Sequence, residues 1–198
     1  QPAFNAGYWP EARRMARHTL KTLEASAGPV VLLSGSCTAM IRNHYPDLFA
    51  EEPDRQARLR ALAQRVFEFS EFLWTQREKA PPPSAAPLPQ VAYHPSCHLL
   101  RTLGVDQQPK GLLRAAGVDF SALPPECCGF GGVFAVEQPE LSGELLARKI
   151  AAIEASGAQV VTGCDISCLL HIEGGLRKRG SSVRCLHLAR ILEAREAA

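Results

Sequence analysis

Apolar residues recur along this chain at two spacings. Ala16, Leu20 and Leu23 follow the four-then-three step of a buried helical face, and Leu146, Ile150 and Ile153 repeat that step. Short continuous apolar runs lie between the helical stretches, as expected for strands buried on both faces. The predicted strands are residues 30–33, 90–93, 118–121, 159–162 and 183–186.

The helical stretches are identified by spacing and by their first residues. Pro10 stands at a favourable first-turn position. Residues 55–79 form one long amphipathic pattern through Leu59, Leu62, Val66, Phe69 and Leu73. The predicted helices are residues 10–26, one that begins near Cys37, 55–79, 109–116, 139–156, 166–179 and 187–194. The alternation predicts an α/β fold with mainly parallel sheets flanked by helices.

The chain contains an internal repeat. Residues 23–31 (LEASAGPVV) match residues 153–161 (IEASGAQVV), and Ser36-Cys37 matches Ser167-Cys168 at nearly the same offset of about 130 residues. We therefore predict two pseudo-symmetric repeats joined by a proline-rich linker that cannot be helical. The predicted boundaries are 1–79 for the first repeat, 80–89 for the linker and 90–198 for the second repeat.

The repeat also predicts that the first unit is incomplete. At the same offset, Cys127-Cys128-Gly129 would correspond to the three positions before Gln1. We expect the front of the first repeat to be missing at its N-terminus. Cys37 would then be the remnant of a first-repeat site.

Five of the seven cysteines form one pattern. Cys97 is followed after a long gap by Cys127-Cys128-Gly129, and after a second gap by Cys164 and Cys168. Thiolates are soft ligands that suit iron–sulfur clusters and zinc. Two adjacent thiolates strain to reach one tetrahedral zinc, whereas a cluster offers several irons. Glycine at position 129 lets the backbone approach a bulky group. The pattern favours an iron–sulfur site.

Other interpretations stay open at this stage. Cysteine is often a small buried hydrophobe, which suits Cys185 in its apolar run. A zinc site could use Cys97, His98 and the adjacent pair, and a catalytic thiol could be Cys97 flanked by His94 and His98. An odd number of cysteines in a chain of this length argues against a disulfide framework.

Composition excludes several classes of function. The 198 residues carry a net charge of +2 at pH 7, which provides no basic footprint for nucleic acid. No apolar run approaches the roughly 18 residues of a membrane-spanning helix. Free thiols favour a reducing compartment, so we expect a cytoplasmic protein. Gly129–Gly132 is the only glycine-rich stretch, and its cysteines do not match a dinucleotide fingerprint.

Three segments make the chain resemble the cysteine-rich Cys-Cys-Gly domain proteins. They are 93–100 (YHPSCHLL), 127–132 (CCGFGG) and 163–174, and the likeness extends over essentially the whole chain. That group includes the Cys-Cys-Gly subunit of heterodisulfide reductase and the iron–sulfur subunit of glycolate oxidase. The chain most resembles the lactate-utilisation protein A family. In that family the opening segment follows a first Cys-Cys-Gly, which agrees with the truncation expected above.

The resemblance implies two half-sites related by pseudo-symmetry, each capable of holding a [4Fe-4S] cluster or a non-cubane relative with its own cysteines. It implies an electron-transfer subunit of an L-lactate or glycolate oxidising complex, with a ferredoxin-type partner and peripheral attachment to the inner membrane face through partners. The alternatives are a thiol/disulfide reductase acting at its own cluster and a zinc-stapled assembly scaffold. One departure is the spacing of Cys164 and Cys168, which differs from the Cys-x-x-Cys of heterodisulfide reductase.

The candidate ligands and their neighbours follow from these patterns. The predicted iron ligands are Cys97, Cys127, Cys128 and Cys168, with Cys164 as an additional candidate. Cys168 ranks above Cys164 because the repeat places it opposite Cys37. Predicted neighbours that could hydrogen-bond a cluster are His94, His98 and Gly129, whereas His171 and His187 are assigned to packing. Arg101 and Lys110 are candidate counter-charges, or members of a solvated face.

Overall fold

The computed structural model describes residues 1–79 and 89–196. The predicted linker, 80–89, lies outside the described residues except for its last position. The helices and strands of the first part are α1 (Pro2–Asn5), α2 (Trp9–Glu24), β1 (Val30–Leu32), α3 (Gly35–Ala39), the π-helix Met40–His44, α4 (Tyr45–Leu48), α5 (Pro53–Ala63), β2 (Val66–Glu68), α6 (Phe69–Gln76) and the 3₁₀ turn Arg77–Lys79.

The second part alternates strands and helices more regularly. Its elements are β3 (Val91–Tyr93), the π-helix His98–Thr102, α7 (Gln107–Ala115), β4 (Phe120–Ala122), α8 (Val133–Glu137), α9 (Pro139–Ser156), β5 (Val160–Gly163), α10 (Ile166–Lys178), β6 (Arg184–His187) and α11 (Leu188–Glu196). The order of strand and helix agrees with the α/β prediction.

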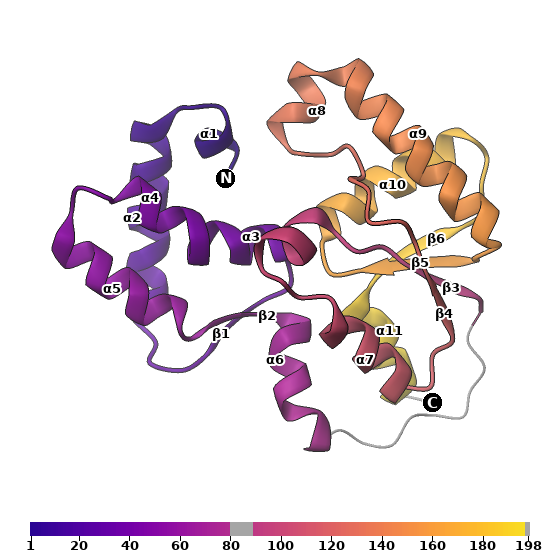
Figure 1. The fold of residues 1–198 in the computed structure, drawn as a ribbon, viewed down its shortest axis with the longest axis horizontal. Helices are drawn as coiled ribbons and strands as arrows, with labels where there is room; N and C mark the ends of the chain where they lie inside the picture. Colours follow the sequence, from indigo (N-terminus) through magenta and orange to yellow (C-terminus); the bar gives the residue numbers. More distant parts are fainter. Residues whose placement is uncertain (80–88, 197–198) are drawn as a thin grey trace.

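A four-stranded parallel sheet forms the centre of the second part (Figure 1). Its strand order is β4-β3-β5-β6, and all three pairings are parallel. Helices α7 and α11 cover one face, and α9 and α10 cover the other (Figure 1). The neighbours Val160 and Val161 show the alternation, because their side chains enter opposite core clusters. Both faces are therefore apolar, and polar chemistry is left to the strand ends.

The first part contains a smaller sheet. Strand β1 pairs in parallel with β2, with Val30 opposite Val66 and Leu32 opposite Glu68. Helices α2, α4 and α5 enclose one core with these strands. In each part, the last residue of a strand caps the helix that follows. The Glu68 carboxylate, at the end of β2, accepts from the Ser70 amide of α6 at 2.8 Å. In the second part, His187 Nδ1, at the end of β6, accepts from the Ala189 amide of α11 at 3.1 Å.

The prediction of one helix over 55–79 is wrong. The chain leaves the helical path after α5, forms strand β2, and starts again in α6. The apolar spacing could not reveal this break, because Val66 is buried equally well in a strand, where it lies beside β1. Pairing with a distant strand overrode the local periodicity. The strand predicted at 118–121 is also displaced and is observed at Phe120–Ala122.

The two parts meet at a local two-fold relation. Ser34 and Asp165, which are equivalent at the repeat offset, form an antiparallel bridge with each other. The Gly35 amide donates to the Cys164 carbonyl at 3.3 Å across the same seam. A Cβ at Gly35 would lie 2.9 Å from the Leu99 Cβ, so glycine permits this close approach. The carboxyl ends of β1 and β5 consequently face one another.

Candidate metal centre

Four predicted ligands converge at the carboxyl edge of the four-stranded sheet. Cys97 follows β3, Cys127 and Cys128 lie in the loop between β4 and α8, and Cys168 lies in the first turn of α10 after β5. Parallel strands end at the same edge, which is where open α/β sheets place their ligands. Residues thirty or more positions apart in the chain thus become neighbours.

The four thiols form a continuous chain of contacts. The Cys127 thiol interacts with those of Cys97 and Cys128, and Cys128 interacts in turn with Cys168. Hydrogen bonds from the Cys128 and Cys97 thiols lower the pKa of Cys127, and the Gly129 amide adds a donor 3.3 Å from its sulfur. The same interactions raise the pKa values of Cys97 and Cys128. The four soft donors are therefore close enough for each thiol to change the pKa of its neighbours.

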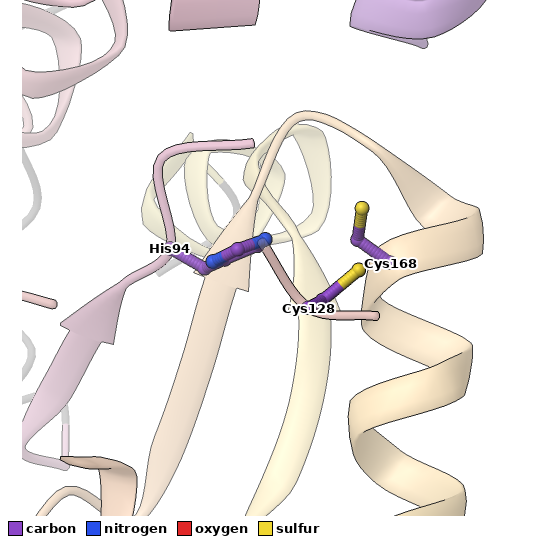
Figure 2. Close-up of side chains that lie close together, drawn as sticks. All are labelled: His94, Cys128 and Cys168. Carbon is purple, nitrogen blue, oxygen red and sulfur yellow. The ribbon is translucent and has the colours of Figure 1, made fainter. Parts of the chain in front are cut away.

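His94 lies beside two of these thiols. Its ring is 1% exposed, and neither ring nitrogen has a hydrogen-bond partner among the described residues. A ligand atom of His94 and the sulfurs of Cys128 and Cys168 all lie within 4.8 Å of one another. Figure 2 shows these side chains converging from the end of β3, the Cys127–Cys128 loop and α10. Burial and, to a smaller extent, the Lys149 charge lower the pKa of His94 to about 3, so the imidazole is neutral.

The loop that carries the adjacent cysteines is tightly held. Gly129 has φ +91°, and a Cβ there would lie 2.4 Å from the Ser142 carbonyl oxygen on α9. The Ser142 hydroxyl donates to the Gly129 carbonyl at 2.8 Å. Only glycine tolerates both the positive φ and the close approach of the Ser142 carbonyl. Its role is thus close packing of the loop on α9, which presents Cys127 and Cys128 to the site.

A cavity of about 140 Å³ opens beside the thiols. All four cysteines contribute to its wall, together with Asp165 and Ser36 from the seam and residues of α1. The volume far exceeds the roughly 10–15 Å³ that one water requires. The cavity has room for a polyatomic group, and the unpartnered nitrogens of His94 lie behind its wall, close to Cys128 and Cys168. The residues present therefore fit a metal cluster, and the four cysteines are its candidate ligands.

The remaining cysteines lie elsewhere. Cys164 is fully buried with Tyr93 and Leu99 in the core beneath α7 and α11, whereas Cys128 and Cys168 belong to the core on the other face of the sheet. Burial raises the pKa of the Cys164 thiol well above its usual value. Cys185 is half-buried, and burial raises its pKa to about 12. Cys37 is exposed on α3, where its amide donates to the Ser34 hydroxyl at 3.3 Å.

Of the other polar residues predicted from the sequence, some line the cavity and some have structural partners elsewhere. His98 lines the cavity, with Nδ1 3.8 Å from the Cys97 sulfur and Nε2 3.1 Å from the Gln1 side-chain nitrogen. His171 packs on Phe130 and His187 caps α11. Arg101 donates to the Pro125 carbonyl at 3.0 Å, and Lys110 pairs with Asp106 at 2.6 Å. These last two cations have partners other than the thiols.

Two polar residues of the site were missed by sequence reasoning. The buried Asp165 carboxylate accepts from the Ser36 amide at 3.0 Å, the Ser34 hydroxyl at 3.3 Å and the Ser167 hydroxyl at 2.5 Å. Burial tends to raise its pKa, but these hydrogen bonds outweigh burial and lower it. No sequence signal marks this pairing of distant residues.

Lys149 is the second missed residue. It is 1% exposed and its ammonium donates to the Pro124 carbonyl at 2.7 Å. A signal did exist, because Lys149 stands three residues after Leu146 and four before Ile153. That spacing places it on the buried face of α9.

Comparison with known proteins assigns the chain to a family. Residues 91–173, which include the four converging cysteines, match the cysteine-rich domain family CCG. Over 199 residues the chain is 37% identical to "Lactate utilization protein A" of Shouchella clausii, covering 99% of this chain and 82% of the relative. The protein of the same name from Macrococcus caseolyticus is 41% identical over 196 residues, 97% of this chain and 78% of the relative. The protein from Exiguobacterium sp. is 38% identical over 198 residues, which cover 97% of this chain and 79% of the relative.

Proposed function

Since the chain belongs to the lactate utilization protein A family, we propose that it is an iron–sulfur electron-transfer subunit of a complex that oxidises L-lactate or a related 2-hydroxy acid such as glycolate. The observation that carries the proposal is the convergence of Cys97, Cys127, Cys128 and Cys168 around one cavity. A cluster bound there would supply one-electron transfer, with a potential set by hydrogen bonds, charge and solvent exposure.

The chain's own residues would hold and tune that group. The four thiolates are the proposed ligands. His94, neutral and without other partners among the described residues, would hydrogen-bond or ligate the bound group through its free nitrogens. The sheet faces and α9 exclude water from the inner side, while the cavity leaves the outer side open for a partner.

Removal of a hydride equivalent from lactate requires chemistry that a one-electron carrier lacks. We therefore propose partner subunits that hold the organic cofactor, among them a ferredoxin-type electron carrier. None of the helices in the described part of the chain is long and apolar enough to span a membrane. In the proposed arrangement the complex is cytoplasmic, and any contact with the inner membrane face is through the partners.

The first test is composition. Full-length protein purified without oxygen should be brown and contain iron and acid-labile sulfide. Stoichiometric zinc without iron would instead support a second candidate, a zinc-stapled scaffold. One observation favours that candidate: the ligand atoms of His94, Cys128 and Cys168 are close enough together to share one ion.

The second test is turnover. The isolated, cluster-loaded chain should show no lactate-dependent dye reduction, and activity should appear when the partner subunits are added. Lactate oxidation by the isolated chain would contradict the carrier role. Reduction of a disulfide by the isolated chain with a one-electron donor would replace it by the thiol/disulfide reductase alternative.

A further inference from the structure

Helix α9 holds the Cys127–Cys128 loop at both of its ends. Ser142 donates to the Gly129 carbonyl at 2.8 Å, and Lys149 donates to the Pro124 carbonyl at 2.7 Å. The two side chains are seven residues apart and so lie on the same face of the helix, two turns from each other. The cysteine loop thus rests along one face of α9.

An ammonium group is unusual at the buried position of Lys149. The side chain is 1% exposed and is followed in the helix by the core residue Ile150. No carboxylate among the described residues lies within ion-pair distance of it, since none of the ion pairs there includes Lys149. Burying an ammonium costs several kcal/mol unless an opposite charge compensates. A single carbonyl acceptor does not require a cation, because a neutral amide donor could serve it equally well.

The negative charge near Lys149 only partly offsets its burial, and most of the groups that provide it are thiols of the site. Burial lowers the pKa of Lys149, whereas the exposed Glu126 and the sulfurs of Cys128, Cys127 and Cys168 act in the opposite direction. The influence extends to His94, whose protonation the lysine charge disfavours. The ammonium and three proposed ligands therefore interact electrostatically within one poorly solvated region, where charges act strongly on one another.

We propose that Lys149 is the fixed counter-charge of the thiolate site and raises the reduction potential of the group bound there. The inference rests on the proposed iron–sulfur function. Uptake of one electron adds one negative charge to a site already rich in thiolate. A buried cation stabilises the reduced form more than the oxidised form, so the electron is accepted at a higher potential. Lys149 acts on the potential from outside the ligand set.

The test is a redox titration of the cluster-loaded full-length protein with dithionite, followed by electron paramagnetic resonance. Lys149→Gln retains an N–H donor for the Pro124 carbonyl but removes the charge. Arg148→Gln is the matched control: it removes the same formal charge at the neighbouring position, where the side chain is 63% exposed and paired with Glu144. We expect a lower midpoint potential for Lys149→Gln and a value close to wild type for Arg148→Gln. Equal potentials for the two variants would overturn the proposal.

A second measurement covers the case in which Lys149→Gln takes up too little iron for titration. The thermal midpoint is measured before and after cluster removal by a chelator. A counter-charge predicts that Lys149→Gln raises the midpoint of the cluster-free protein, because a buried and poorly compensated ammonium has been removed. If the cluster-free variant has a lower thermal midpoint than the cluster-free wild type, Lys149 only stabilises the fold, and the proposal is overturned.

Failure of this inference can be told from failure of the proposed function. Wild-type protein without iron and sulfide would refute the function itself. Wild-type protein that is fully loaded, together with an unchanged potential in Lys149→Gln, would refute only the role of Lys149.

Discussion

Cys37 and Cys168 occupy equivalent places in the two predicted repeats but differ in their surroundings. Each follows a serine in the first turn of the helix that succeeds a strand, Ser36-Cys37 after β1 and Ser167-Cys168 after β5. Cys168 is buried against Cys128, whereas Cys37 is exposed and lines no part of the cavity. A helix start after a strand therefore places a cysteine at the right edge but does not by itself create a ligand site.

The neighbouring strands make the difference. In the second part, β5 is flanked by β3, and β3 by β4, so the loops after these strands deliver Cys97 and the adjacent pair beside Cys168. Among the described residues β1 pairs only with β2, whose end leads directly into α6. A multi-cysteine centre thus depends on how many strand ends meet at one edge.

The largest expected effect comes from breaking the second-repeat site at its centre. Cys128→Ser should lose most of the iron, because Cys128 lies between Cys127 and Cys168 in the chain of thiol contacts. Since metal binding is coupled to folding, the thermal midpoint should fall by several degrees. Iron analysis and thermal melts of anaerobically purified protein are the measurements. Unchanged iron and unchanged stability would show that the ligand assignment is wrong.

A second comparison separates the two cysteines that follow β5. Cys168→Ala should lose most of its iron, whereas Cys164→Ala should retain most of it, because the Cys164 side chain lies in the core on the opposite face of the sheet. Iron content per chain decides between them. Cys164→Ala still creates a small cavity in a packed core, so its stability should drop even when its iron does not. Retention of iron by Cys168→Ala alone would reverse the ranking.

The next effect concerns Glu68, which in the first part occupies the capping position that His187 has in the second. Burial raises the pKa of Glu68 from 4.5 to about 7. Between these values the folded state holds a proton that the unfolded state has lost, so stability falls as pH rises and levels off above 7. Glu68→Gln should remove this pH-dependent loss of about 3 kcal/mol in the free energy of unfolding. Urea unfolding of both proteins at pH 5 and pH 8 measures it, and parallel declines would contradict the prediction.

A substitution of Asp165 tests the seam between the two parts of the chain. Asp165→Asn should cost about 2 kcal/mol, because a charged acceptor of several hydrogen bonds becomes neutral. The pKa of Asp165 is lowered below 3.8, so this stability is present above that value and is lost as pH falls through the folded-state pKa. Denaturant unfolding should therefore show the full difference at pH 7 and a smaller one near pH 3. Asp119→Asn, at an exposed position, is the control and should have little effect.

The smallest effect is expected at Cys37. Cys37→Ala should leave the iron of this chain and its stability essentially unchanged, because the thiol is exposed and is not part of the cavity wall. Iron analysis beside Cys168→Ala provides the direct contrast between equivalent positions. Loss of iron in Cys37→Ala would mean that the first repeat contributes to the site after all.

The α/β class and the cysteine pattern could be predicted from the sequence alone. Strand and helix alternation are local properties, visible in runs such as 159–162 and in the three-four spacing of Leu146, Ile150 and Ile153. The adjacent Cys127-Cys128 and the glycine after it are likewise local, because a soft donor pair and a close backbone approach need no distant partner to be identified. The convergence of the cysteines could be anticipated, since parallel strands place their carboxyl ends at one edge.

Features that depend on partners far apart in the chain could be identified only in the folded protein. Strand β2 exists because Val66 lies beside Val30, although its local spacing is helical. Asp165 holds Ser34 and Ser36, which are about 130 positions away. Lys149 reaches the cysteine loop, where it donates to the Pro124 carbonyl, only because α9 packs against that loop. Burial and charge pairing are properties of the folded environment, and a periodic pattern records which face is apolar without recording what that face will meet.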